Sequence, residues 1–295
     1  MSIHQLIRQE RLPTDFSDTV EAFIRPLAER VSHWHAGSPL LIGINGGQGT
    51  GKSTLATFLR HLLVNDHGLP TAVLSIDDLY LPRTERQQLA HEVHPLLATR
   101  GVPGTHDPAL GLQVIDALMR ADADTCTQLP RFDKSTDDRL PVEQWPVFRG
   151  RAEVIILEGW CVGARPQAKS ELEEPINALE REEDADGRWR HYVNAQLAGP
   201  YRPLFARIDY LIQLVAPSMA CIRQWRGEQE DKLRAKLSAE EASQLLDAAA
   251  LDRFIAHYQR LTEHQWRDLL GVADAVLQLD ADHAISRIEW KGERP

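Results

Sequence analysis

The amino-acid sequence predicts an α/β protein with a doubly wound, five-stranded parallel sheet. Short apolar runs that are typical of buried strands alternate with longer segments whose apolar residues recur at helical spacing. The earliest clear strand is followed at once by a glycine-rich loop and a helix. This alternation indicates parallel strands joined by crossover helices that cover both faces of the sheet.

Residues 46–53 carry the strongest motif of the chain. They match the phosphate-binding loop pattern G-x-x-x-x-G-K-[ST] without a mismatch, between a strand predicted at residues 40–44 and a helix predicted at residues 53–64. Glycines let backbone N–H groups surround a phosphate, and the helix adds the positive end of its dipole. We therefore expect a nucleotide here, with Lys52 reaching its β- and γ-phosphates and Ser53 binding Mg²⁺. The predicted nucleotide-binding residues are Gly46, Gly47, Gln48, Gly49, Thr50, Gly51, Lys52, Ser53 and Thr54.

Length and composition leave two domain arrangements open. The 295 residues include 43% hydrophobic residues, which is enough for a sizeable core. The length fits either two domains or one α/β domain with insertions. Apolar residues at helical spacing identify residues 1–36 as a helical N-terminal appendage, so we place the main domain at residues 37–295.

Charge and hydropathy narrow the class of protein. A formal net charge of −10 argues against nucleic acid as the main partner. The chain has no apolar run long enough to span a bilayer, and residues 1–11 do not resemble a signal peptide. We therefore expect no membrane partner and a cytoplasmic location, where the widely spaced Cys126, Cys161 and Cys221 would be reduced thiols.

Two acidic residues follow a second strand, which is predicted at residues 71–76. Asp77 and Asp78 would lie at the carboxyl end of a parallel strand, where α/β sheets bind ligands. A carboxylate in that place can orient an acceptor hydroxyl, and the alternative is a helix cap or a turn. Strand alternation favours Asp77 as the residue that faces the phosphate loop, but a turn would exchange the two roles.

Basic residues are frequent in the segments that come next. Residues 81–108 are rich in Pro, His, Arg and Gly, and we predict a long ordered loop there. A polar segment at residues 128–139 follows later and contains Arg131 and Lys134. These two side chains either neutralise a substrate or a phosphate, or are simply solvated.

A third strand, predicted at residues 152–157, ends at Glu158. This is the position of the acidic residue that helps to hold Mg²⁺ in phosphate-loop proteins, and Glu stands here where Asp is commoner. Residues 168–187 are strongly acidic, and we interpret them as a solvated helix or loop and not as a metal site.

The last third of the chain completes the predicted sheet. Strands are expected at residues 210–215 and 275–279, with a long helical region at residues 217–270 between them. We expect a short final helix after residues 280–283.

Several of these stretches resemble the D-glycerate 3-kinase family and its uncharacterised bacterial and fungal relatives. That family belongs to the larger group of phosphoribulokinase, uridine kinase and pantothenate kinase. The resemblance spans roughly residues 40–285 and implies a P-loop kinase fold that uses ATP and Mg²⁺ to phosphorylate a hydroxyl of a small, anionic metabolite, with a glycerate-type acceptor first. The matching stretches are residues 75–80, 100–107, 132–135, 157–160 and 224–226 with Glu230.

The resemblance also implies roles for single residues. Asp77 would lie beside the acceptor hydroxyl, and Arg226 would stabilise the transferring phosphoryl group from a lid at about residues 218–237. His283 would lie where the adenine packs. The candidates for the acceptor site are Asp78, Tyr80, Arg100, His106, Arg131 and Lys134.

Two rival functions stay open on the sequence alone. One is a kinase of the uridine, pantothenate or phosphoribulose type. The other is a nucleotide-dependent switch that hydrolyses ATP without a small acceptor. A GTPase switch is disfavoured because the guanine-binding pattern [NT]-K-x-D does not occur in the chain. The identity of the acceptor and the oligomeric state do not follow from the sequence.

Overall fold

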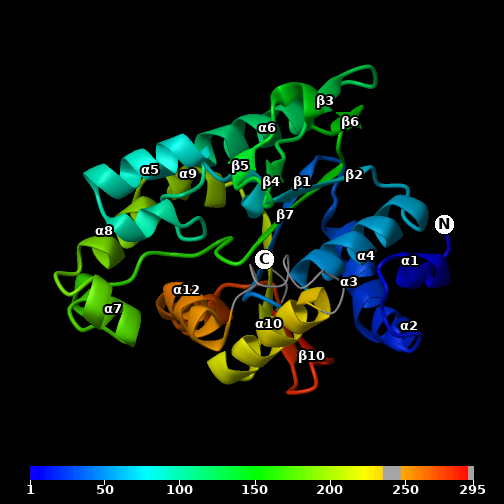
Figure 1. Ribbon diagram of the computed structural model, residues 1–295. Helices are drawn as coiled ribbons and strands as arrows, with labels where there is room; N and C mark the ends of the chain where they lie inside the picture. Colours follow the sequence, from blue (N-terminus) through cyan, green and yellow to red (C-terminus); the bar gives the residue numbers. More distant parts are fainter. Residues whose placement is uncertain (235–246, 292–295) are drawn as a thin grey trace.

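A six-stranded sheet with the strand order β10-β9-β8-β1-β7-β2 forms the centre of the molecule (Figure 1). The computed structural model describes residues 1–234 and 247–291. The first five strands of this sheet in the chain are parallel, and β10 runs antiparallel to β9. The strands are β1 (Leu40–Gly46), β2 (Thr71–Ser75), β7 (Val154–Gly159), β8 (Tyr210–Val215), β9 (Ala275–Leu279) and β10 (Ile285–Trp290).

The five predicted parallel strands are all present, and the antiparallel strand β10 adds a sixth where a short final helix was expected. Asp280 turns the chain, because its carboxylate accepts hydrogen bonds from the backbone N–H groups of Asp282 and Ala284. The chain then returns along β9, and Ile288 and Trp290 pack against the core of the sheet. Apolar residues two apart are typical of a strand and not of a helix.

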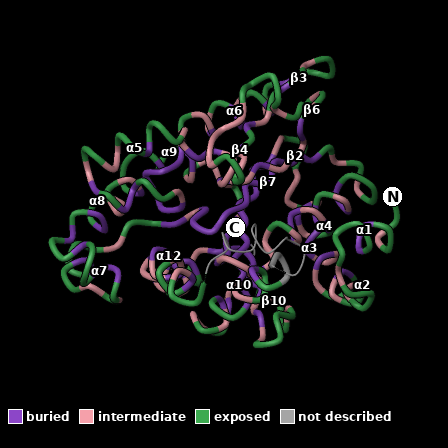
Figure 2. The backbone as a smooth tube through the Cα atoms, viewed as in Figure 1, coloured by how far each residue is buried: buried purple, intermediate pink, exposed green. Residues whose placement is uncertain are grey.

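Helices cover both faces of the sheet, which confirms the doubly wound prediction. In Figure 1, α1 to α4 lie on one side and α6, α8 and α9 on the other. Along β1 the side chains alternate, with Ile42 and Ile44 in the cluster under α4 and Leu41 in the opposite cluster. Figure 2 shows the central strands buried between these layers. The covering helices are α3 (Arg25–Trp34), α4 (Lys52–Asn65), α6 (Pro108–Arg120), α8 (Arg188–Ala198), α9 (Tyr201–Phe205) and α12 (Ala248–Asp268).

The N-terminal segment is helical and shares the core of the sheet. It consists of α1 (Ile3–Gln9), α2 (Phe16–Thr19), a π-helical turn η1 (Val20–Ile24) and α3. Leu27 and Val31 are fully buried in the same cluster as β1 and α4. Trp34 stacks on Tyr210 of β8 with 4.1 Å between the ring centroids. Residues 1–36 therefore close one face of the sheet.

The connection from β2 to β7 is long and more regular than predicted. Residues 81–108 were expected to form a loop, but they contain α5 (Arg83–Glu92) and a 3-10 turn η3 (Pro95–Ala98). Helix α5 is almost wholly polar, so the sequence has no apolar stripe there that would predict a helix. Its fixed point is Arg86, which is 1% exposed and donates to the carbonyls of Leu81, Ala98 and Asp137. The other elements are η2 (Ile76–Leu79), β3 (Cys126–Gln128), β4 (Phe132–Asp133), β5 (Asp138–Arg139), η4 (Val142–Gln144) and β6 (Val147–Arg149).

We expected the acidic segment at residues 168–187 to be solvated, but part of it is buried. It forms η5 (Lys169–Leu172) and α7 (Ala178–Glu183). Glu180 and Asp184 are fully buried, where they pair with Arg260 at 2.6 Å and with Arg190 at 2.9 Å. Burial of these acids is possible because each meets an arginine with several hydrogen bonds.

The helical region at residues 217–270 is present as α10 (Met219–Arg234), α12 and η6 (Leu269–Gly271). The end of the predicted lid, residues 235–237, lies outside the described residues. Within residues 1–234 and 247–291, none of the helices has the length and apolar character needed to cross a membrane.

Candidate active site

Three neighbouring strands bring the predicted site residues to one edge of the sheet. β7 lies between β1 and β2, and Glu158 is paired with Ile44 on one side and with Ser75 on the other. The glycine-rich loop follows β1, and Asp77 comes two residues after Ser75. The loop and the two acids therefore meet at the carboxyl edge of the sheet, where α/β proteins bind their ligands.

The loop has the backbone form that its glycines predict. Gly49 and Gly51 have φ angles of +78° and +86°, which side chains with a Cβ rarely adopt. Thr50 closes the turn, since its N–H and its hydroxyl both donate to the carbonyl of Gly47, at 3.3 and 2.8 Å. Lys52 begins α4, and its N-cap residue Gly51 makes no side-chain cap. The first N–H groups of α4 are thus left for an anion.

Helix α10 packs directly on this loop. A Cβ atom on Gly47 would lie 2.4 Å from Cδ1 of Ile222, and one on Gly49 would lie 3.3 Å from Cβ of Trp225 and 3.7 Å from the backbone nitrogen of Arg226. Gly47 and Gly49 thus allow the close approach of the helix, and Gly49 also has the φ angle that the turn requires.

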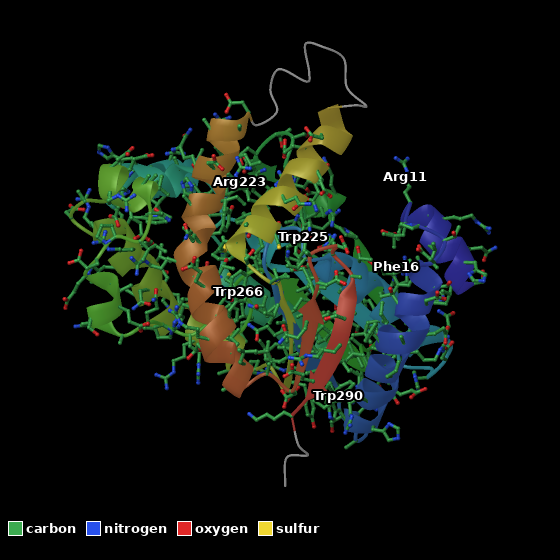
Figure 3. All side chains as sticks on the ribbon, turned by 90° about the horizontal axis from the view of Figure 1, so that it is seen from below. Arg11, Phe16, Arg223, Trp225, Trp266 and Trp290 are labelled. Atoms are coloured by element: carbon green, nitrogen blue, oxygen red, sulfur yellow. The ribbon has the colours of Figure 1, made fainter. Side chains whose placement is uncertain are left out.

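Trp225 and His283 form an aromatic pair beside the loop. Their rings stack with 4.4 Å between centroids, and Nε1 of Trp225 donates to the carbonyl of Ala281 at 3.4 Å. In Figure 3, Trp225 lies on the side of α10 that faces the β9–β10 hairpin. The predicted base-binding residue His283 thus lies near the loop, as an exposed ring stacked on Trp225, which is 2% exposed.

Ser53 and Glu158 form the candidate Mg²⁺ site. The Ser53 hydroxyl donates to Oε1 of Glu158 at 3.0 Å. Glu158 is 5% exposed, and its Oε2 is buried without a partner among the described residues. A buried carboxylate oxygen is costly when it is left unpaired. A hydroxyl and a carboxylate are both oxygen ligands of the kind that Mg²⁺ prefers, so these residues fit the ion.

Asp77 lies on the 3-10 turn η2 and not on the end of the strand. Its Oδ1 accepts a hydrogen bond from the Tyr80 hydroxyl at 2.9 Å, and its Oδ2 meets Nζ of Lys134 at 2.6 Å. Burial raises the pKa of Asp77, but the positive charges of Lys134 and Lys52 outweigh it and hold the pKa below the usual value. The charge of Lys52 thus reaches the carboxylate that we predicted as the base.

Asp78 has a different environment. Its two oxygens accept from the backbone N–H of Phe132 at 3.1 Å and from Arg131 at 3.2 Å, so both are engaged by the β4–β5 hairpin. Burial raises its pKa. Asp78 thus holds the hairpin through two hydrogen bonds, whereas the positive charge of Lys52 in the phosphate loop lowers the pKa of Asp77.

Tyr80 and His106 form a buried stack behind Asp77. Their rings lie 4.4 Å apart, and His106 Nδ1 is 2.7 Å from the hydroxyl of Tyr201. Burial lowers the pKa of His106 to about 3, so its ring is neutral at physiological pH. His106, predicted to hold an anion, therefore carries no charge with which to do so.

Arg100 lies on the other side of the hairpin. It forms an ion pair with Asp137, which also pairs with the buried Arg86 at 2.9 Å. Its guanidinium lies over the ring of Phe132 at 5.5 Å. Burial raises the pKa of Asp137, but the hydrogen bonds and charges of Arg86 and Arg100 outweigh burial and hold the pKa below its usual value.

Arg226 is near the loop but is held by its own helix. Its guanidinium forms an ion pair with Glu230 and lies 5.4 Å from the ring centroid of Phe254. The structure therefore brings the backbone of Arg226 to Gly49, while the guanidinium is paired with a carboxylate.

Several residues that build the site were given no role in the predictions from the sequence. Tyr201 holds residues 104–106 in place, since the N–H groups of Gly104 and His106 both donate to its hydroxyl. Trp160 donates to the carbonyl of Gly101 at 2.8 Å and meets the ring of Tyr258 edge-on. Trp160 is part of the matching stretch at residues 157–160, which is the signal in the sequence that could have found it.

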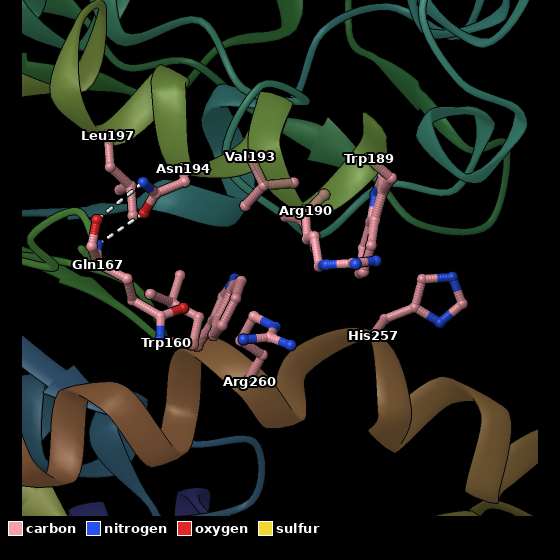
Figure 4. Close-up of a pocket in the computed structure, with 11 residues that line it drawn as sticks. Trp160, Gln167, Trp189, Arg190, Val193, Asn194, Leu197, His257 and Arg260 are labelled. Atoms are coloured by element: carbon pink, nitrogen blue, oxygen red, sulfur yellow. Dashed lines mark hydrogen bonds between the residues drawn. The ribbon is translucent and has the colours of Figure 1, made fainter. Parts of the chain in front are cut away.

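A small pocket lies outside this site, between α8 and α12 (Figure 4). Two arginines face it, but Arg190 is neutralised by Asp184 and Arg260 by Glu180, so the pocket offers no net charge to a phosphate. No residue of the predicted site lines it. The lining residues are Val102, Trp160, Gln167, Trp189, Arg190, Val193, Asn194, Leu197, His257, Arg260 and Leu261.

The chain is similar in sequence to known kinases. The chain is 34% identical over 214 residues to the uncharacterized kinase mug58 of Schizosaccharomyces pombe, which covers 68% of this chain and 73% of that protein. It is 29% identical over 216 residues to the chloroplastic D-glycerate 3-kinase of Arabidopsis thaliana, covering 70% of this chain and 45% of the relative. No family model matches the chain.

Among solved structures, the fold resembles D-glycerate 3-kinase from Cryptococcus neoformans. The TM-score is 0.73 at 25% sequence identity, over 92% of this chain and 99% of that one. The likeness therefore extends over almost the whole of both chains and is not confined to the nucleotide-binding core.

Proposed function

Because the chain belongs to the P-loop kinase family related to D-glycerate 3-kinase, uridine kinase, phosphoribulokinase and pantothenate kinase, we propose that it phosphorylates a hydroxyl of a small anionic metabolite. The kinase relatives make it an ATP-dependent kinase, and the acceptor is the proposal. One observation carries it: the phosphate loop after β1 and Asp77 after β2 meet at the same edge of the sheet, on the two sides of Glu158 at the end of β7. A phosphate donor and a candidate base are thus within one site.

The reaction needs positioning more than covalent chemistry. The hydroxyl oxygen of the acceptor attacks the γ-phosphorus of ATP while the bond to the β,γ-bridging oxygen breaks, and ADP leaves with the electron pair. Asp77 orients the hydroxyl and accepts its proton late in the transfer. Lys52 neutralises charge on the phosphates, and Tyr80 holds the Asp77 carboxylate from a buried position.

Ser53 and Glu158 would hold Mg²⁺. When bound, the ion neutralises charge on the β- and γ-phosphates of ATP. The protein's part is to present the Ser53 hydroxyl and the Glu158 carboxylate on two adjoining elements, the start of α4 and the end of β7.

The cations around Asp77 favour an anionic acceptor. Lys134 contacts Asp77 itself, Arg131 contacts the adjacent Asp78, and Arg100 contacts the same hairpin through its ion pair with Asp137. Lys134 and Arg131 are largely exposed, so both can turn toward a ligand. A carboxylate is the acceptor group that would draw on these charges, and glycerate is the first acceptor to test.

We would measure ATP consumption by the purified chain with Mg²⁺ against hydroxy acids, nucleosides and sugar phosphates. The proposal expects ADP formation that depends on a small hydroxy acid. Turnover that depends on a nucleoside would move the acceptor to the uridine-kinase type. Turnover that is the same with and without every compound would contradict the kinase proposal and favour a nucleotide-dependent switch.

A further inference from the structure

The two oxygens of Asp77 are held by donors that differ in mobility. Tyr80, which donates to Oδ1, is 4% exposed and lies stacked on His106. Lys134, which meets Oδ2 at 2.6 Å, has a side chain that is 60% exposed. One donor is thus fixed by packing, and the other is free to leave.

The hairpin that carries Lys134 is itself firmly held. At its tip, Asp133 accepts hydrogen bonds from the backbone N–H and the hydroxyl of Ser135. At its far end, Asp137 is paired with Arg86 and Arg100. The Lys134 side chain can therefore move while its backbone stays in place.

An ion pair with an exposed lysine is cheap to break, since such pairs change an equilibrium by only about 5-fold or less. Lys134 is the cation of the hairpin that contacts Asp77. An anionic ligand that enters beside Asp77 would therefore meet the ammonium of Lys134. A second carboxylate near Asp77 is repelled by it, so the lysine is the natural bridge to such a ligand.

We propose that Lys134 is an acceptor-responsive counter-ion of Asp77. Without an acceptor, Lys134 occupies Oδ2 of Asp77 and withholds that oxygen as a proton acceptor. An anionic acceptor draws Lys134 to itself, and Asp77 is released to receive the hydroxyl proton. The inference rests on the proposed function and gives it a safeguard against wasteful hydrolysis of ATP.

The chemistry that the contact restrains is the same displacement with water in place of the acceptor. A water oxygen attacks the γ-phosphorus, the bond to the bridging oxygen breaks, and ADP and inorganic phosphate form. The proton of the water passes to Asp77 if that carboxylate is accessible. Pairing with Lys134 also makes Asp77 a weaker base, which slows this route further.

The test is the rate of ADP formation from Mg²⁺-ATP with no acceptor present. We expect Lys134→Ala to raise this background rate about 3- to 5-fold, in line with the loss of one exposed ion pair. Lys134→Arg keeps the charge and should raise the rate less than Lys134→Ala does. Adding Asp77→Asn to Lys134→Ala should bring the rate back to the natural level or below. Lys169→Ala, at an exposed lysine of η5 outside the site, is the matched control.

A background rate that is unchanged or lower in Lys134→Ala would overturn the inference. So would a raised rate that persists in the double variant, since the hydrolysis would then not pass through Asp77. A role of Lys134 in gripping the acceptor alone would leave this rate unmoved. Acceptor-dependent transfer is measured in parallel on the natural chain. If it is absent with every compound, the proposed function fails, while the background rates still decide whether Lys134 restrains Asp77.

Discussion

The hydroxyl of Ser53 donates a hydrogen bond to Glu158 at 3.0 Å, and so joins the start of α4 to the end of β7. The two residues are separated by 105 positions in the chain. The contact leaves Oε2 of Glu158 buried without a partner among the described residues. A bound cation would give this carboxylate oxygen a partner.

The first prediction follows from that contact. Glu158→Gln keeps the shape but removes the charge, and we expect the Mg²⁺ concentration for half-maximal turnover to rise about 10- to 100-fold. The measurement is ATP turnover over a Mg²⁺ titration. Glu153→Gln is the control, because Glu153 pairs with His35 and lies before β7. An unshifted Mg²⁺ dependence would remove Glu158 from the metal site.

The second prediction concerns Lys52. Among the described residues no hydrogen bond or ion pair holds its side chain, and its charge acts on Asp77 only at a distance. Lys52→Ala should lower turnover by at least about 10²-fold, as expected for a lost group that stabilises transition-state charge. The free energy of unfolding should change by only about 0.5 kcal/mol. If ATP affinity and turnover both survived, the phosphate-loop assignment would be wrong.

The third prediction separates the two acids after β2. Asp77→Asn should lower kcat by about 10²- to 10⁴-fold with ATP binding close to normal, because a general base is lost. Asp78→Asn should lower kcat less, since both Asp78 oxygens are engaged by the hairpin. Steady-state kinetics and nucleotide titration check both variants. Full acceptor-dependent turnover in Asp77→Asn would falsify the proposed mechanism even with the fold correct.

The fourth prediction concerns α10 as a lid. Arg226 is paired with Glu230, although its backbone lies against Gly49 of the loop. A γ-phosphate would compete for that guanidinium, and closure would exclude water. Hydrogen exchange over residues 218–237 should slow when a non-hydrolysable ATP analogue and an acceptor are both added. Exchange in α4 serves as the internal reference, and equal behaviour of the two helices would argue against a lid.

The fifth prediction is a pH dependence of stability. Burial lowers the pKa of His106 from 6.5 to about 3 in the folded chain. The unfolded chain therefore binds the extra proton between these values, and stability falls as the pH drops from 6.5 toward 3. Denaturant midpoints at pH 5 and pH 7 should differ less in His106→Gln than in the natural chain. A His106 ring that titrates near its ordinary pKa by NMR would contradict this.

Local pattern was enough for the parts of the fold that depend on neighbouring residues. The apolar runs at β1, β7 and β8 predicted buried strands, and the glycine loop was placed between a strand and a helix. Helix α5 was missed because what holds it is one buried arginine, Arg86, bonded to distant carbonyls. A hydropathy pattern contains no sign of such a contact.

The pairing of charges was beyond the sequence for the same reason. Glu180 and Asp184 look like members of a solvated acidic run, and only the folded chain brings Arg260 and Arg190 to them. Lys134 was a candidate for the acceptor, but its contact with Asp77 joins residues 57 positions apart. The residue types were predictable, and their partners were not.

The place of β1 in the sheet has a consequence for the synthesis of the chain. Both neighbours of β1 come later in the sequence, since Leu40 pairs with Val154 of β7 and Ile42 with Tyr210 of β8. β2 is made soon after β1, yet β7 must enter between them. A nascent chain therefore carries an apolar central strand with open edges until β8 has left the ribosome. Such edges attract other chains, so premature termination before β8 should give products that aggregate.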